Sequence, residues 1–325
     1  MNDTFTMDLS DTLKSEIVWL NRYLEDLSKE SEDILGGLLS YVLVNSGKRI
    51  RPMLVVLGSN LGESDINHVR LVGAAVEMIH IATLVHDDII DKSILRRGQK
   101  TVASEHGIDK AVLLGDYLYS QAFEKIMATS NIEVLKIMAK TASVICRGEI
   151  EQLNKKFEFE VSEYEYYSFI KRKTASFFGA AARSGAVIAN TDLRIQIALE
   201  SYGINLGMGF QIKDDLLDIT GDEDVVGKTL HTDMVNGRMT LPLIHFRDTL
   251  PSPQAFKKLM DEMAQSNDNF SKILERIREA GSIRYAEDVA TQYVEKALDS
   301  LKMLPEGEAK DQLFILAKQS LKRKS

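Results

Sequence analysis

The sequence predicts an all-α protein that forms one domain over residues 1–325. Apolar residues recur at helical spacing along most of the chain. Only 5 prolines interrupt its 325 residues, and because a proline inside a helix costs about 3 kcal/mol, long helices are permitted. Runs that alternate apolar and polar residues are missing, and so are the glycine patterns of nucleotide-binding folds. A linker rich in proline, glycine or serine is also missing, which indicates a single domain.

The individual helices follow from this periodicity. Segments are expected at roughly 11–27, 31–44, 104–129, 132–154, 162–189 and 193–219. A further long helix should end near Asp91, and Ser64 or Asp65 is suited to cap its N-terminus. Near the C-terminus, one helical face carries Ala286, Ala290, Tyr293, Ala297 and Leu301.

The composition is that of an ordinary globular protein. Hydrophobic residues make up 44% and charged residues 27% of the chain. The formal net charge is −8, whereas a surface that binds nucleic acid must be basic. We therefore expect no nucleic-acid partner.

Cysteine usage and hydropathy indicate in which cellular compartment the protein is expected. The single cysteine, Cys146, excludes an internal disulfide and is typical of a reducing compartment, so a cytoplasmic location is expected. Its neighbours are mostly apolar, which predicts a buried, unreactive thiol. The N-terminus lacks the apolar run of a signal peptide. The most hydrophobic stretch, Leu71–His86, is shorter than the ~20 residues that a membrane span needs, so no transmembrane segment is expected.

Two acidic clusters with the same spacing carry the chemical signal. The first is DDIID at Asp87–Asp91, and the second is DDLLD at Asp214–Asp218; each ends an apolar helical run. In each cluster the first and last aspartates share one helix face, with Cβ atoms roughly 5–6 Å apart. Such carboxylates repel each other unless a cation lies between them. Mg²⁺ suits this arrangement, because it binds one or two carboxylates and takes its other ligands from phosphates and water.

A single cluster of this kind is often only a solvated helix end. Two copies, each following an apolar helix of similar length, make coincidence a poor explanation. Both clusters also lie near helix C-termini, where the helix macrodipole disfavours negative charge. The pair therefore predicts a metal site that handles phosphate groups.

Basic residues that could bind such a phosphate occur around the two clusters. The loop Gly47–Pro52 (GKRIRP) contains three of them, and Pro52 suits the first turn of the next helix. Helix N-termini with basic side chains bind anions readily. The remaining candidates are, in chain order, Arg96, Arg97, Lys173, Lys228 and Arg238. Each of these alone is usually solvated surface, so their meaning depends on the acidic clusters.

Taken in order, these motifs resemble the trans-isoprenyl (polyprenyl) diphosphate synthase family over nearly the whole chain. The matching segments are GKRIRP, HDDIID followed by RRG, KTA, and FQIKDDLLD followed by GK and TLP. The chain looks most like long-chain members such as octaprenyl diphosphate synthases. The resemblance implies antiparallel helices around a deep central cavity, Mg²⁺ as cofactor and a homodimer. It also implies sequential 1′-4 condensation of isopentenyl diphosphate onto an allylic diphosphate, either geranyl or farnesyl diphosphate.

The resemblance further implies a role for each matching residue. Mg²⁺ would be held by Asp87, Asp88, Asp91 and Asp214, with Asp215 and Asp218 completing the second cluster. The diphosphate of isopentenyl diphosphate would be bound by Lys48, Arg49, Arg51, His80 and Arg97. The allylic diphosphate would be bound by Arg96, Lys173 and Lys228. Oxygen atoms near the carbocation would come from Thr174 and Gln211.

Two of these positions need comment. The family usually has lysine where Arg238 stands, and a forked guanidinium differs from an ammonium point charge. The positive charge for a phosphate contact is retained, and the aspartates are intact, so we expect an active enzyme. His80 would otherwise be interpreted as a satisfied core histidine, and only its place before the first motif assigns it to the substrate.

Product length is predicted from the residues about one helical turn before Asp87. An extended isoprene unit is about as long as one helical turn, ~5.4 Å. Short-chain relatives typically have an aromatic residue there, whereas this chain has Ala82 and Thr83, with Met78 next along the Ala82 face. An open channel and a hexaprenyl to decaprenyl product are expected, octaprenyl first, such as a quinone side-chain precursor. The channel floor would then be set deeper, by Tyr119, Phe123 or Met127. Alternatively, Ala82 is small only for close helix packing.

Three other functions are weighed against this one. A class I terpene cyclase normally mixes Asn, Ser or Thr and Glu in its second metal motif, which DDLLD does not. A non-catalytic regulatory subunit usually lacks an aspartate cluster or the basic motifs, and this chain has both. A short-chain farnesyl or geranylgeranyl diphosphate synthase is the main alternative.

Overall fold

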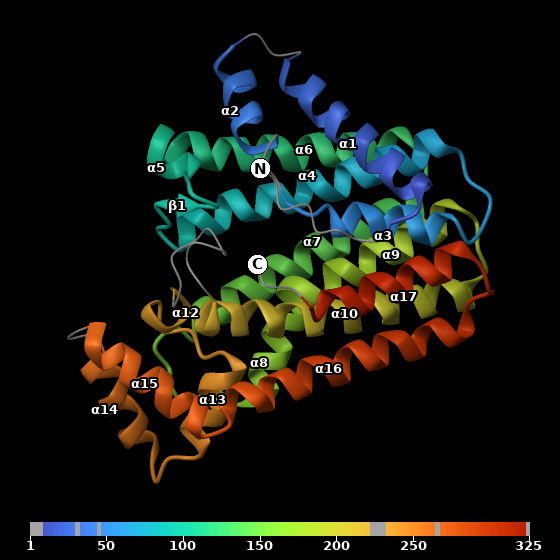
Figure 1. Cartoon of the computed structure of the whole chain (residues 1–325). Coiled ribbons are helices and arrows are strands. Elements are labelled where there is room, and N and C mark those ends of the chain that lie inside the picture. The colour runs from blue at the N-terminus through green and yellow to red at the C-terminus, as the bar shows by residue number, and fades with distance from the viewer. Residues whose placement is uncertain (1–8, 30–32, 44–46, 222–231, 264–266, 323–325) are drawn as a thin grey trace.

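The computed structural model describes residues 9–29, 33–43, 47–221, 232–263 and 267–322, and it is almost entirely helical (Figure 1). The first half comprises α1 (Asp11–Lys29), α2 (Ile34–Leu43), α3 (Ile50–Ser59), α4 (Ile66–Ile90), α5 (Val102–His106), α6 (Ile108–Ala128) and α7 (Ile132–Leu153). The second half comprises α8 (Glu163–Ile170), the π-helix η1 (Lys171–Ala175), α9 (Ser176–Ile188), α10 (Leu193–Thr220), α12 (Thr232–Val235), α13 (Leu241–Asp248), α14 (Pro253–Met263), α15 (Asn267–Glu279), α16 (Ser282–Ser300), the 3₁₀-helix η2 (Leu301–Met303) and α17 (Glu308–Ser320).

The expected all-α class is confirmed. Within the described residues, strand pairing is limited to the hairpin of β1 (Leu95–Arg96) and β2 (Gln99–Lys100). The expected cap is also present, since the Asp65 carboxylate accepts a hydrogen bond from the Asn67 backbone N–H at 2.8 Å. The segment expected as one helix at 104–129 is divided, because Gly107 takes a left-handed φ of 94° between α5 and α6.

Helix α4 is a core helix that has the limits expected from the sequence, but it is longer than the apolar stretch Leu71–His86 within it. It has 25 residues, so by length and composition alone it could cross a membrane. However, 67% of its most apolar window is buried inside the protein, where α6 and α3 pack against it. The expectation of no membrane span rested on a stretch that was too short to cross, and that reason is wrong. Burial by neighbouring helices explains the apolar composition instead.

The core has two apolar clusters that α10 and α16 connect. One lies among α1–α7, α9 and the first half of α10, and the other lies among α8, α13–α15 and the second half of α10. Glycine permits the closest approaches: a Cβ on Gly185 of α9 would lie 2.0 Å from the Val55 carbonyl oxygen of α3. A Cβ on Gly203 of α10 would lie 2.5 Å from the Phe178 carbonyl oxygen of α9. Helix α9 is therefore held tightly between α3 and α10.

One side-chain expectation is wrong. Cys146 is exposed, and it lies on an exposed stripe of α7 together with Ser143, Arg147 and Ile150. The apolar neighbour Ile145 is buried, but a helix turns about 100° per residue, so adjacent residues face different surroundings.

The fold brings the two acidic clusters to the same end of the bundle. Helices α4 and α10 both run towards the hairpin, and in Figure 1 their C-terminal ends lie near β1 and α12 respectively. Because α10 packs on α9 and α16 while α4 packs on α6, the two clusters approach each other from different layers.

Candidate active site

Each carboxylate of the first acidic cluster is paired with a cation. Asp88 receives two hydrogen bonds of 2.9 Å from Arg96 Nε. Asp87 lies 3.5 Å from Lys173 Nζ. Asp91, at the C-cap of α4, receives hydrogen bonds from Arg238 and Lys156. All three carboxylates of the first cluster therefore lie beside positively charged side chains.

Burial and these partners shift the pKa values in opposite directions. Burial raises the pKa of Asp87, although Lys173 opposes this shift. Burial also raises the pKa of Asp88 in spite of its hydrogen bond from Arg96. For Asp91, burial acts upward, but the hydrogen bond and charge of Arg238 outweigh it, and the pKa is lowered. Asp91 is thus the most strongly ionised of the three.

Two carboxylates of the second cluster are fixed by uncharged donors. Asp215 is buried, and it accepts hydrogen bonds from the Tyr166 hydroxyl at 2.6 Å and the Gln211 amide at 2.8 Å. Burial, together with the charge of Asp233, raises the pKa of Asp215 to about 8. Asp218 is also buried and accepts a hydrogen bond from the Asp233 backbone N–H at 3.2 Å. Both carboxylates are therefore buried within the protein, whereas Asp214 is half-exposed.

Arg238 connects the two clusters. Its guanidinium pairs with Asp91 of the first cluster and lies 3.4 Å from Asp233, whose N–H binds Asp218 of the second. A left-handed Gly237, with φ 67°, precedes it. The structure thus places Arg238 at the acidic site, although whether it contacts phosphate stays a prediction.

A basic cluster lies beside the acidic one. His80 on α4 lies among arginines from two segments, the GKRIRP segment and the β1–β2 hairpin. Burial lowers its pKa well below 6.5, and the charges of Arg51, Arg97, Arg96 and Arg49 act in the same direction. Burial and the neighbouring Arg96 likewise lower the pKa of Arg97. An anion placed among cations that are crowded in this way would be stabilised by them.

Local backbone geometry allows this crowding. Gly47 has φ 54°, and a Cβ there would lie 2.8 Å from Arg97 Nη2. The Arg51 guanidinium lies over the rings of Phe177 and Phe178, 5.4 Å and 4.6 Å from their centroids. The first contact brings the GKRIRP loop and the hairpin together, and the second holds the start of α3 against α9. Lys48 is half-exposed in the same loop.

Arg49 was expected to bind the diphosphate of isopentenyl diphosphate, but its side chain faces the interior of the protein. Its side chain is buried and pairs with Glu77 of α4 at 2.7 Å; the two side chains are 4% and 3% exposed. It also donates to the Leu43 carbonyl at 3.0 Å and to Asn21 Oδ1 at 3.0 Å. The left-handed backbone of Arg49, with φ 53°, turns its side chain inward. Arg49 therefore fixes the loop to α1 and α4, and a direct role in binding substrate is not supported.

The π-helix η1 positions the next group of residues. Such insertions frequently occur at functional sites, because they change which side chains share a helix face. Here η1 directs Lys173 towards Asp87 and Thr174 towards α10. The Thr174 hydroxyl donates to Gln211 Oε1 at 2.7 Å, and Gln211 in turn donates to Asp215. The sequence predicted these residues as neighbours of the acidic site, and the structure brings them together.

Two residues of the site were missed in the sequence. Glu149 of α7 is buried and pairs with Lys173, and its charge contributes to the raised pKa of Asp87. Lys156 follows α7 and pairs with Asp91. A lone acid in a helix and one lysine of a Lys-Lys pair carry no local signal, so only their tertiary neighbours identify them.

The remaining predicted positions lie in different surroundings. Lys228 is outside the described residues. Ala82 and Met78 have no exposed surface, whereas Thr83 is half-buried and its hydroxyl donates to the His80 carbonyl at 2.7 Å. On α6, Tyr119 and Phe123 are half-buried and Met127 is 65% exposed. Their roles in product length stay predictions.

The donor set fits Mg²⁺ bound together with a phosphate-bearing substrate. Within the described ranges, no group of three or more His, Cys, Asp or Glu side chains is gathered closely enough to hold a metal alone. Hard carboxylate oxygens are nevertheless present in Asp87, Asp91 and Asp214, and a Mg²⁺ ion usually binds one or two of them and keeps other oxygen ligands. Substrate phosphates would supply those remaining ligands.

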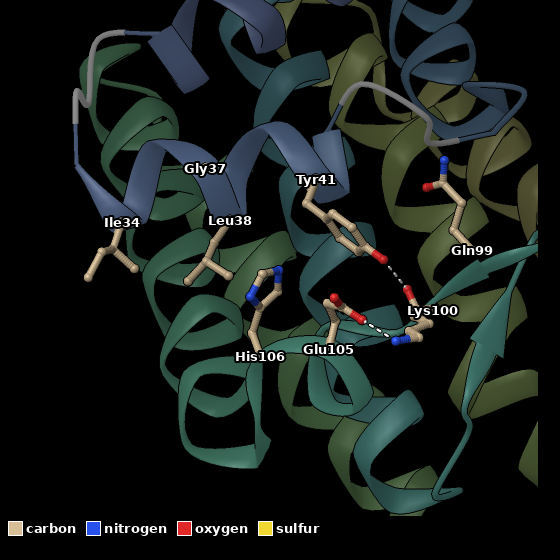
Figure 2. A pocket seen from close by; sticks show the side chains of 8 residues that line it. All are labelled: Ile34, Gly37, Leu38, Tyr41, Gln99, Lys100, Glu105 and His106. Carbon is tan, nitrogen blue, oxygen red and sulfur yellow. Dashed lines mark hydrogen bonds and ion pairs between the residues drawn. The ribbon is translucent and has the colours of Figure 1, made fainter.

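A separate surface pocket lies on α2 and the segment from β2 to α5, and none of its residues belongs to the clusters above. It has a volume of about 730 Å³ and is lined by Ile34, Gly37, Leu38, Tyr41, Gln99, Lys100, Glu105 and His106. Figure 2 shows two contacts among its polar groups: Tyr41 donates to the Lys100 carbonyl at 2.6 Å, and Lys100 pairs with Glu105 at 2.7 Å.

Comparison with known proteins gives a consistent result. Residues 32–277 match the family model described as polyprenyl synthetase. The chain is 34% identical over 312 residues to heptaprenyl diphosphate synthase component 2 of Bacillus subtilis, covering 96% of this chain and 89% of that protein. It is 35% identical over 292 residues to octaprenyl diphosphate synthase of Haemophilus influenzae, covering 89% and 88%. It also resembles a polyprenyl synthase of Caulobacter crescentus solved with calcium and isoprenyl diphosphate (TM-score 0.91, 33% identity), covering 97% of this chain and 96% of that chain.

Proposed function

The chain belongs to the polyprenyl synthetase family and is a prenyltransferase, and we propose from this premise that it is a Mg²⁺-dependent long-chain synthase. It would add isopentenyl diphosphate units to geranyl or farnesyl diphosphate by sequential 1′-4 condensation. The observation that carries the proposal is the pair of acidic clusters, connected through Arg238 and bordered by the basic cluster around His80.

The residues divide into two substrate sites. Asp87, Asp91 and Asp214 would hold Mg²⁺, which supplies positive charge for the departing diphosphate when it is bound. Arg96 pairs with the adjacent Asp88 and Lys173 lies beside Asp87, and both cations would bind the allylic diphosphate. The cluster of Lys48, Arg51, His80 and Arg97 would hold isopentenyl diphosphate beside it, which brings the two reacting carbons together.

The chemistry then needs orientation and a dry site. Thr174 and Gln211 hold each other by a hydrogen bond and would direct their oxygen atoms towards the allylic cation. Water would have to be excluded by the surrounding helices, because it would otherwise trap that cation. We propose that the released diphosphate accepts the proton that is lost after the new bond forms.

Product length is the finer part of the proposal. We propose a hexaprenyl to decaprenyl product, with octaprenyl diphosphate as the main species, because small residues stand at Ala82 and Thr83. The relatives named heptaprenyl and octaprenyl synthases support a long product. The main alternative is a farnesyl or geranylgeranyl diphosphate synthase.

One experiment tests the reaction and the product together. The purified chain is incubated with Mg²⁺, farnesyl diphosphate and excess isopentenyl diphosphate, and the products are identified by mass spectrometry. We expect octaprenyl diphosphate in the wild type. In Ala82→Phe, the main product should shorten to about geranylgeranyl length, because a ring one turn above the motif closes the channel. A wild-type product that stops at farnesyl or geranylgeranyl diphosphate would contradict the channel argument.

Assembly is part of the same proposal, together with a cytoplasmic location. On α6, Ile108, Val112 and Leu113 expose large apolar side chains, and a homodimer that covers this face is the arrangement that the family resemblance implies. The name of the B. subtilis relative, component 2, raises a second candidate in which a different subunit is needed. Light scattering of the purified chain separates the two. A dimer that is active alone supports the homodimer, and a chain that is inactive until a second protein is added supports the heteromer.

A further inference from the structure

Lys156 lies in the short turn after α7, and its side chain reaches the first acidic cluster. Its Nζ donates to Asp91 Oδ1 at 3.3 Å, and the two side chains are 20% and 14% exposed. The neighbouring Lys155 faces a different set of groups: its Nζ lies 2.7 Å from Glu158 and 3.5 Å from Glu165. The two adjacent lysines therefore have different surroundings. One points into the site and the other pairs with acids on the surface.

The backbone after Lys156 is held in an uncommon conformation. Phe157 has φ 63°, which is unfavourable for a bulky residue. Its N–H donates to the Gly237 carbonyl at 2.9 Å, and a Cβ on Gly237 would lie 2.4 Å from the Phe157 ring. This contact joins the turn after α7 to the segment that carries Arg238. Strain of this kind persists only where neighbouring structure enforces it, and it often marks a functional site. The contact fixes Lys156 and Arg238 on the same carboxylate.

Like Arg96 and Lys173, which are proposed to bind the allylic diphosphate, Lys156 pairs with a carboxylate of the first acidic cluster. Four cations, Arg96, Lys156, Lys173 and Arg238, pair with five carboxylates, Asp87, Asp88, Asp91, Glu149 and Asp233. The cations of this network therefore fall one charge short of the carboxylates. Binding of Mg²⁺ would leave an excess of positive charge there, and an allylic diphosphate would neutralise that excess.

We propose that Lys156 is a binding residue for the allylic diphosphate, an inference that rests on the proposed prenyl-transfer function. While the cluster is unliganded, Lys156 neutralises Asp91. Once the Asp91 carboxylate ligates Mg²⁺, the nearest negative charge available to Lys156 is the diphosphate on that metal. A lysine side chain is long and flexible enough to change partner without moving the backbone, which the Phe157–Gly237 contact holds in place.

The test compares Lys156→Gln with the matched control Lys155→Gln. Binding of farnesyl thiodiphosphate, an analogue that does not ionise, is measured by calorimetry in saturating Mg²⁺. We expect Lys156→Gln to raise its dissociation constant by about tenfold or more, because one charge-assisted contact is lost. Lys155→Gln should stay within about twofold of wild type, because its charge lies in an exposed pair. Lys156→Arg should recover most of the affinity.

Steady-state kinetics of the same variants assign the contact to one substrate. The Michaelis constant for farnesyl diphosphate should rise in Lys156→Gln, while that for isopentenyl diphosphate stays within about twofold. Equal dissociation constants in Lys156→Gln and Lys155→Gln would overturn the inference. So would tighter Mg²⁺ binding in Lys156→Gln with unchanged analogue affinity, because Lys156 would then only compete with the metal. A wild-type chain that binds the analogue but does not elongate farnesyl diphosphate would instead refute the proposed function.

Discussion

The two acidic clusters have the same spacing in sequence but different surroundings in the fold. In the first, every carboxylate is paired with a cation from a long, flexible side chain, and these partners can exchange for a metal ion. In the second, Asp215 and Asp218 accept hydrogen bonds from uncharged donors inside the core. DDxxD spacing alone therefore does not give each aspartate one role. Only the leading positions, Asp87 and Asp214, are expected to act alike.

The largest expected effect tests that shared position. Asp87→Ala and Asp214→Ala should each lower turnover by about 10³-fold, because each would remove a metal ligand that stabilises developing charge. Helical content, measured by circular dichroism, should not change, because both side chains lie at helix ends that are only half-buried. Near-normal turnover in either variant would show that its cluster does not bind the catalytic metal.

The basic residues also differ in role, because Arg49 is buried in an ion pair whereas others are proposed to bind substrate. Glu77→Ala should lower the free energy of unfolding by about 3–5 kcal/mol, because it leaves the buried Arg49 charge without its carboxylate. The double variant Arg49→Met/Glu77→Leu should recover much of this loss in chemical denaturation.

A second ion pair serves as the control for the buried Arg49–Glu77 pair. Glu16→Ala breaks the Glu16–Arg70 pair, which joins α1 to α4 but is partly solvated, so it should lower the free energy of unfolding by less than Glu77→Ala does.

Arg51→Ala should mainly raise the Michaelis constant for isopentenyl diphosphate, by about tenfold or more. If Arg51→Ala weakens only the allylic substrate, the two diphosphate sites have been exchanged in our assignment.

A smaller effect is expected inside the second cluster. Asp215→Ala should destabilise the protein by about 2–3 kcal/mol, because the Tyr166 hydroxyl and the Gln211 amide lose a buried acceptor. Asp215→Asn should cost much less, since burial raises the pKa of Asp215 to about 8 and a neutral side chain suits that site. Thermal denaturation at neutral pH measures both. An Asn variant as unstable as the Ala variant would indicate that the charge itself is required.

The smallest predicted effect concerns pH and the basic cluster. Burial and the charges of Arg51, Arg97, Arg96 and Arg49 hold the pKa of His80 well below 6.5, so the folded state keeps it neutral. The unfolded chain takes up a proton below about pH 6.5, and folding stability should therefore fall as the pH decreases. Between pH 7.5 and 5.5 this contribution is at most about 1.4 kcal/mol. In His80→Gln the difference in melting temperature between these two pH values should shrink; an unchanged difference would contradict the assignment.

The sequence alone determined the helices and the types of chemistry present. The ends of α4, α7 and α10 lie within a few residues of their predicted limits, because periodicity and capping depend on neighbours three or four positions away. Local rules suffice for the helix limits, since each is set within a single helical run. That Asp87, Lys173, Thr174 and Gln211 surround one site was implied only by the resemblance of the ordered motifs to a known family.

Only the tertiary structure decided the partners of residues that have the same type and occur in similar motifs. Arg49 turns to Glu77, 28 residues away, while Lys156 and Arg238 reach Asp91 across 65 and 147 residues. Whether a carboxylate binds metal or supports the scaffold depends on such partners and on burial. Both are set by the packing of helices that are distant in the chain, so two DDxxD motifs that read alike in the sequence become different sites in the fold.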